Sequence, residues 1–208
     1  MTAPGEPPAV LGPPRGDRPA EPAVERMWRR LSFEAVPVGD DPLLEYVDTL
    51  DGLLVNGGAE LARLRVPEND TFDWYAAANR LGEVGVAERL LASDAPNDAV
   101  PALDTRDGVT AAPDPERVHS LVLAGHLAVV LVQGGAYRSF EGSHAEAREL
   151  AERARAALFG ERYGEVAVRR SGAQWSDWFR GVPHPDDTWV ALDRRTREVS
   201  VLVATDTD

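Results

Sequence analysis

The chain contains no cysteine, so its fold is held together without disulfides. Disulfides, zinc ribbons, iron–sulfur clusters and thiol catalysis all require cysteine and are therefore excluded. Hydrophobic residues make up 43% of the 208 residues, enough for the core of one domain of ordinary size or of two small ones. We expect the chain to fold unaided.

Lysine is also absent, and all 22 basic side chains are arginines. A Walker-type phosphate loop needs its lysine, and a Schiff-base enzyme needs a titratable amine, so neither class fits this chain. Carboxylate, histidine, hydroxyl and arginine chemistry remain, together with binding that involves no chemistry. No motif selects a reaction, and no cofactor is predicted.

The net charge of −13 is concentrated in the first half of the chain. Residues 34–104 carry 15 acidic and 4 basic side chains, a balance of −11, whereas residues 105–170 carry 9 of each. A negative field repels nucleic acids and anionic membranes and favours a basic partner. The simpler alternative is that the charge only keeps the protein soluble.

The N-terminal residues suggest a flexible arm. Residues 1–22 are dominated by proline, glycine and alanine and cannot bury enough apolar area to offset the entropy of ordering, so we expect them to be disordered. They lack the charged-then-apolar order of a secretory signal, and no run in the chain approaches the ~20 apolar residues of a membrane span. We therefore expect a cytoplasmic protein.

Helical spacing of apolar residues dominates the first half. Asp41 before Pro42 is a typical helix start, because aspartate caps free N–H groups and proline is tolerated at the first helical position. A hairpin that turns at Asp51-Gly52 is the alternative for this segment. We expect an acidic helical region over residues 23–104, with helices near 21–31, 43–54, 70–81 and 84–92 and a linker over 94–114.

The second half, residues 105–208, combines helix and strand signals. An apolar segment over 114–133 ends at Gly-Gly and indicates a buried helix, and Ser143 with Glu146 forms the capping box of an alanine-rich helix. β-rich runs predict strands over residues 165–170, 188–193 and 199–205. The predicted fold class is α+β, with a helical N-terminal half and C-terminal helices packed on a small antiparallel sheet.

One short pattern occurs twice. LLVNGGA at 53–59 and VLVQGGA at 130–136 lie 77 residues apart. Apolar residues followed by Gly-Gly recur wherever a helix needs a left-handed stop, so the pattern does not by itself favour a duplication.

The segment QWSDWFRGVPHPDDTW contains three of the five tryptophans. It predicts either an aromatic-walled pocket with carboxylates at its mouth, for a cationic or planar ligand or a divalent ion, or core packing under a loop with turn aspartates. We favour core packing. The terminal TDTD lacks the downstream glutamate of a calcium loop. Of the four histidines, only His184 has acidic neighbours with which it could form an acid–base pair. The candidate ligand-binding residues are Trp175, Trp178, His184, Asp186, Asp187, Trp189, Asp206 and Asp208.

Two resemblances follow from these motifs. WSDWF, DDTWVALD and the terminal TDTD resemble the endings of a group of uncharacterised actinobacterial proteins, and the exclusive use of arginine fits a GC-rich genome. This resemblance covers the last third of the chain and implies no activity. VNGG followed by DWYAAANRLGEVGVAERLLAS is similar to the NGG-then-helix pattern of a helical bacterial family that includes DNA mimics, although Ala59 replaces that family's aromatic residue.

The sequence thus predicts a non-enzymatic binding protein, regulatory or immunity-like, that engages a basic protein partner through its acidic N-terminal half. The alternative is a small-molecule or metal-dependent enzyme that uses the aromatic and acidic cluster at 175–189 and the C-terminal aspartates. The uneven charge favours the first hypothesis, and the cluster favours the second.

Overall fold

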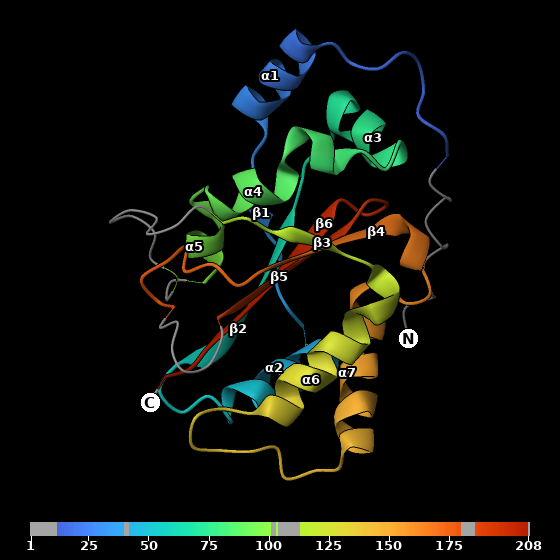
Figure 1. The fold of residues 1–208 in the computed structure, drawn as a ribbon. Helices are drawn as coiled ribbons and strands as arrows, with labels where there is room; N and C mark the ends of the chain where they lie inside the picture. Colours follow the sequence, from blue (N-terminus) through green and yellow to red (C-terminus); the bar gives the residue numbers. More distant parts are fainter. Residues whose placement is uncertain (1–11, 40–41, 101–102, 104–112, 180–185, 208) are drawn as a thin grey trace.

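Six antiparallel strands form one sheet in the computed structural model, which describes residues 12–39, 42–100, 103, 113–179 and 186–207 (Figure 1). The order across the sheet is β1-β2-β6-β5-β4-β3. The strands are β1 (Glu34–Ala35), β2 (Gly58–Arg65), β3 (Glu116–Val118), β4 (Val166–Ser171), β5 (Asp187–Asp193) and β6 (Glu198–Thr205).

Helices cover both faces of this sheet (Figure 1). One face packs against α2 (Pro42–Asp51), α6 (Leu123–Gln133) and α7 (His144–Phe159). The other packs against α1 (Glu21–Arg30), α3 (Asp70–Ala77), α4 (Val86–Leu91) and α5 (Ala95–Ala99). Short 3-10 helices occur at Leu81–Val84 (η1), Ser120–Val122 (η3) and Tyr163–Glu165 (η4). The protein therefore has three layers and two apolar cores.

The central strands are buried on both sides because each face has its own helical cover. Every residue of β5 is buried. In β6, Val201 and Val203 belong to the core under α3 and α4, whereas Leu202 and Ala204 belong to the core under α6 and α7. Side chains of a strand alternate between faces, so β6 supplies both cores from one apolar run.

The α+β class is confirmed, but the helical N-terminal half is not. Residues 58–65 form β2, which pairs along its whole length with β6, from Gly58 opposite Thr205 to Arg65 opposite Glu198. The segment GAELARLR is rich in good helix formers, and pairing with an apolar strand overrides that local preference. The sheet consequently joins both halves of the chain.

The buried helix expected over 114–133 begins later than its sequence signal. Residues Glu116–Val118 form the edge strand β3 beside β4, and α6 starts only at Leu123. The capping box at the start of α7 is confirmed: Ser143 Oγ accepts from Glu146 N at 3.2 Å, and Glu146 Oε2 accepts from Ser143 N at 2.7 Å.

The N-terminal segment reaches the α3 layer before α1 begins at Glu21. Trp74 Nε1 donates to Gly16 O at 3.2 Å, and Arg18 Nη2 lies 3.0 Å from Glu83 Oε2. The disordered arm was predicted over 1–22; of this stretch, residues 1–11 lie outside the described residues. No helix in the described part of the chain is long and apolar enough to cross a membrane.

Candidate functional site

The three tryptophans of the sequence cluster lie in different surroundings. Trp175 is fully buried under the α3 and α4 layer, where its Nε1 donates to Thr188 Oγ1 at 2.8 Å. Trp189 is buried on the opposite face of the sheet, with its ring 5.4 Å from that of His126 on α6. Trp178 is half-buried and packs edge-to-face on Phe179. The sheet therefore separates Trp175 from Trp189, and the two do not wall a common cavity.

Asp187, at the start of β5, is buried and bound to an arginine. Arg170 Nε lies 2.6 Å from Asp187 Oδ1, and the same guanidinium carbon lies 5.2 Å from the centre of the Trp189 ring. Burial raises the pKa of Asp187, although the hydrogen bond and charge of Arg170 act in the opposite direction. Arg170 thus makes the largest contribution that favours the charged form of the buried Asp187.

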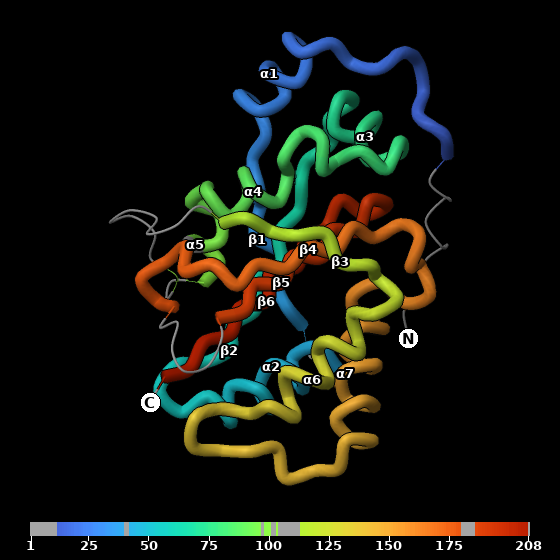
Figure 2. The backbone as a smooth tube through the Cα atoms, in the orientation of Figure 1, coloured from blue at the N-terminus to red at the C-terminus, as the bar shows by residue number. Residues whose placement is uncertain are grey.

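Asp206, immediately after β6, joins the two Gly-Gly loops. Its Oδ1 accepts from Asn56 N at 2.9 Å and its Oδ2 from Ala136 N at 2.7 Å, and its side chain is fully buried. Figure 2 shows the red end of β6 beside the cyan turn between α2 and β2. The two sequence echoes, 77 residues apart, therefore meet at one carboxylate.

Close backbone approach explains a glycine in each loop. A Cβ on Gly57 would lie 1.9 Å from Thr205 O, and a Cβ on Gly135 would lie 2.4 Å from Asp206 Oδ2 and 2.3 Å from Leu53 O. These distances are far inside van der Waals contact with backbone atoms, so any side chain would push the loops away from Asp206. The glycines are required by this junction rather than by helix termination alone.

A cavity of about 260 Å³ opens beside the junction. Its polar wall is formed by Asp187, Asp206, Thr205 and Gln133. Asp186 lies behind this wall and accepts from Thr205 Oγ1 at 2.5 Å. The structure thus brings the candidates Asp186, Asp187 and Asp206 together where β5 begins and β6 ends.

The remaining candidates, His184 and Asp208, lie outside the described residues. Among the residues that the structure does describe, no group of three histidine, aspartate or glutamate side chains could hold a metal ion. The described part of the cluster therefore offers hydrogen-bonding carboxylates rather than a set of metal ligands.

A second group of carboxylates, which we call the acidic corner, lies at the adjacent corner and consists of Asp51 and Glu60 near Trp178, with Asp48 one helical turn before Asp51 on α2. All three carboxylate residues are exposed. A Cβ on Gly58 would lie 2.9 Å from Asp51 Oδ1 and 3.7 Å from Trp178 Cζ2, which places both side chains against the start of β2. Partial burial, followed by the charge of Asp51, raises the pKa of Glu60. This corner brings the acidic half and the aromatic cluster together.

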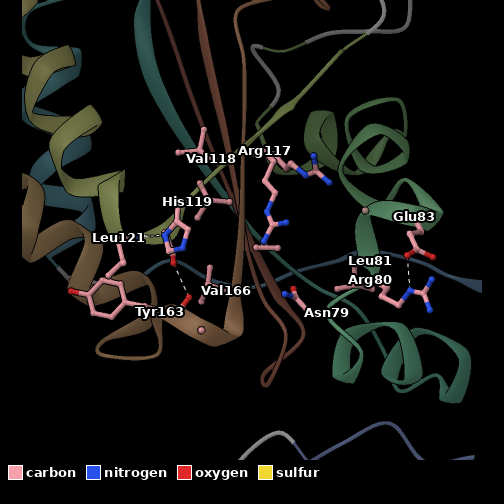
Figure 3. A pocket seen from close by; sticks show the side chains of 16 residues that line it. Asn79, Arg80, Leu81, Glu83, Arg117, Val118, His119, Leu121, Tyr163 and Val166 are labelled. Carbon is pink, nitrogen blue, oxygen red and sulfur yellow. Dashed lines mark hydrogen bonds and ion pairs between the residues drawn. The ribbon is translucent and has the colours of Figure 1, made fainter.

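A further cavity was not anticipated from the sequence. It has a volume of about 550 Å³, lies at the β3–β4 edge and is lined by residues 79–83, 117–121, 163–164 and 166–169 (Figure 3). We call it the arginine groove, after Arg117 and Arg169. The pattern EVAVRR predicted β4 but not its partner β3, so the pairing of Arg117 with Arg169 was not predicted.

Comparison with known protein families, with curated proteins and with solved structures finds no match to this chain.

Proposed function

We propose that the protein is a non-enzymatic binding protein, regulatory or immunity-like, that engages a basic protein partner through the acidic corner of its N-terminal half. The observation that carries this proposal is the set of three exposed carboxylates, Asp48, Asp51 and Glu60, none of which forms an ion pair within the described residues. The half-buried Trp178 beside them offers an aromatic face to an arginine or lysine.

The acidic side chains of residues 34–104 lie on both sides of the sheet, and several of those on one side are already paired. The proposal therefore rests on the acidic corner and not on the whole charge balance of −11. On the α3 and α4 side, Glu68, Asp73 and Glu83 are already paired with arginines of this chain. At the acidic corner, the raised pKa of Glu60 reflects burial and repulsion from Asp51. A cation supplied by a partner would relieve that repulsion, so the corner gains more from a basic ligand than the paired surfaces do.

The same charge argues against nucleic acid as the partner, because phosphates would be repelled from a chain of net charge −13. A cytoplasmic location is part of this proposal, and the cysteine-free composition supports it.

Binding to a fluorescent arginine-rich decapeptide tests this proposal. The double variant Asp48→Asn/Glu60→Gln should weaken binding at least tenfold at 0.1 M salt, because two attractive charges are lost. The control Glu149→Gln/Glu161→Gln removes the same charge from another surface and should bind like the wild type. Association should slow markedly as salt rises, since the Debye length shrinks from ~10 Å at 0.1 M to ~3 Å at 1 M.

Equal losses in the corner variant and the control would mean that only net charge matters. Binding that does not respond to salt would contradict the electrostatic mechanism altogether. A pull-down with the same variants from the native host then identifies the partner.

The second candidate function, a small-molecule or metal-dependent enzyme, is favoured by one observation. The cavity of about 260 Å³ presents the buried carboxylates of Asp187 and Asp206 to whatever enters it. A metal would need ligands beyond the described groups, and a small cation would not. Titration of the wild type and Asp187→Asn with Mg²⁺, Zn²⁺ and guanidinium-bearing ligands separates these cases, and no response to any of them would count against the enzyme.

A further inference from the structure

The arginine groove lies between the β3–β4 edge of the sheet and the turn around η1. Figure 3 shows Arg117 on the strand wall and Asn79 and Arg80 on the facing wall. Its volume of about 550 Å³ falls within the range of small-molecule sites, which is roughly 300–1,000 Å³. The groove is therefore large enough for a metabolite.

Two arginines meet in this groove without a counter-ion. Arg117 and Arg169 are direct partners in the β3–β4 pairing, so their side chains project from the same face of the sheet. Neither forms an ion pair or hydrogen bond with another described residue. Glu83, the acidic residue among those lining the groove, is already bound to Arg80 at 2.5 Å and to Arg18 at 3.0 Å. Like charges directly opposite each other destabilise a sheet, so this arrangement has a cost.

A third arginine, Arg194, interacts electrostatically with Arg117 but does not line the groove. Arg194 donates to Ala76 O at 2.8 Å and to Glu165 O at 3.1 Å, which fixes its guanidinium against backbone carbonyls. Burial lowers the pKa of Arg194, the charges of Glu165 and Asp193 act in the opposite direction, and the positive charge of Arg117 makes the smallest contribution, which lowers it.

The chain has 35 acidic side chains and only 22 basic ones, so acidic partners for arginine are plentiful. Ion pairing within the fold nevertheless does not account for Arg117 and Arg169. We propose that the arginine groove binds the phosphate group of a small organic phosphate monoester, held between Arg117 and Arg169. Two neighbouring arginines that line the same groove suit a dianion, because each guanidinium can donate two parallel hydrogen bonds to its oxygens. The negative surface elsewhere opposes the approach of polyanions such as nucleic acid or an anionic membrane.

The rest of the groove suits the organic part of such a ligand. Leu81 supplies apolar surface on the side of the arginines, whereas Val118 and Tyr163 pack on the opposite face of the sheet and line the groove beyond its edge (Figure 3). His119 Nδ1 accepts from Leu121 N at 3.2 Å, which leaves Nε2 available to a ligand. This combination of an apolar wall and a few polar groups is typical of sites that bind small molecules with an orientation.

Calorimetric titration with phenyl phosphate tests the proposal. Arg117→Gln and Arg169→Gln should each weaken binding about tenfold or more, because each removes charge-assisted hydrogen bonds to the phosphate. The control Arg148→Gln removes the same charge from the exposed face of α7 and should bind like the wild type. Equal binding by all four proteins, or no binding by the wild type at millimolar phenyl phosphate, would overturn the proposal.

Melting temperatures distinguish a ligand-binding role of the two arginines from a structural one. Without ligand, Arg117→Gln/Arg169→Gln should unfold at the same temperature as the wild type or a higher one, because a repulsive pair is removed. Phenyl phosphate should raise the melting temperature of the wild type but not of the double variant. A double variant that is less stable and still responds to phenyl phosphate would assign both arginines to the fold instead.

Two further probes define the ligand class. Benzoate, which carries one negative charge on a similar ring, should bind at least tenfold more weakly than phenyl phosphate, and equal affinity would refute the requirement for a dianion. Gly82→Ala places a Cβ 2.2 Å from the present position of Arg169 Nη2 and should displace that guanidinium. Its affinity for phenyl phosphate should therefore fall toward that of Arg169→Gln, and wild-type affinity would contradict the assigned role of Arg169.

Discussion

Replacing Asp206 by alanine would remove the carboxylate that joins the loop after α2 to the loop after α6. Its two oxygens accept from Asn56 N at 2.9 Å and Ala136 N at 2.7 Å. The side chain is fully buried, so water does not take the place of both acceptors without a rearrangement of the loops. We expect Asp206→Ala to be among the most destabilising single substitutions outside the two apolar cores.

The magnitude follows from these two bonds. A hydrogen bond to a charged group contributes about 1.5–3 kcal/mol, so the loss of both costs about 3–6 kcal/mol before any relaxation. Asn56 is exposed and its N–H can be rehydrated once the loop moves, which favours the lower part of that range, about 3–4 kcal/mol. At about 2–4 °C per kcal/mol for a domain of this size, the melting temperature should fall by about 6–16 °C.

Urea unfolding and amide hydrogen exchange together measure this effect. The amides of Asn56 and Ala136 should lose protection in Asp206→Ala, while those of β5 should keep it. Asp206→Asn retains one acceptor oxygen and should lose roughly half as much stability. Asp177→Ala, an exposed aspartate in the same part of the sequence, is the control and should change stability by less than about 0.5 kcal/mol.

A free energy of unfolding for Asp206→Ala within error of that control, with both amides still protected, would refute the reasoning. It would mean that apolar packing alone holds the two loops, and that the carboxylate only fills space.

Three further outcomes follow from the surroundings of the sequence cluster. Thr188→Val removes the acceptor of Trp175 Nε1 and should lower the free energy of unfolding by about 1–2 kcal/mol in urea, whereas an unchanged value would show that the indole finds another acceptor. Trp175→Ala should cost about 3–5 kcal/mol and Trp178→Ala clearly less, because only the former is fully buried; equal losses would contradict this difference. Burial raises the pKa of Asp187 in the fold, so its ionisation opposes folding: wild-type stability should decline as pH rises from the usual aspartate range to the raised pKa. Asp187→Asn should lack this component, and parallel stability curves between pH 3 and 7 would exclude it.

The parts of the fold that the sequence predicts well depend on local signals. Strands were expected over 165–170, 188–193 and 199–205, within two residues of the ends of β4, β5 and β6. Their β-branched runs are bounded by turn residues, and the capping box of α7 lies within four residues of sequence. Such signals need no knowledge of the rest of the molecule.

β2 and β3 were missed because they depend on partners far away in sequence. GAELARLR reads as a helix until β6 is placed beside it, 133 or more residues later, with all eight residues of β2 in register. Three-residue β3 likewise exists only as an edge beside β4. Propensity alone does not contain these pairings, which are decided by what each strand covers and contacts.

The candidate site was partly predicted for a similar reason. Sequence adjacency grouped Trp175 with Trp189, but the chain crosses the sheet between them and their side chains enter different cores. Asp186, Asp187 and Asp206 lie together because the start of β5 and the end of β6 meet at the same edge of the sheet. The repeated Gly-Gly pattern was visible in the sequence. That both loops bind Asp206 was not, because Asn56 and Ala136 lie 150 and 70 residues before it.

The acidic corner and the arginine groove lie on opposite sides of the sheet's centre, and their separation decides whether they influence each other electrostatically. Four strand spacings of about 4.8 Å separate β2 from β3, at least about 19 Å. This exceeds the Debye length of about 8 Å at physiological salt, although the apolar cores between them screen less than water does. A phosphate ester in the groove should therefore leave the affinity of the corner for an arginine-rich peptide unchanged to within a factor of about two. A larger change at constant ionic strength would require the sheet or its helices to shift between two arrangements, because direct charge interaction over that distance is too weak to produce it.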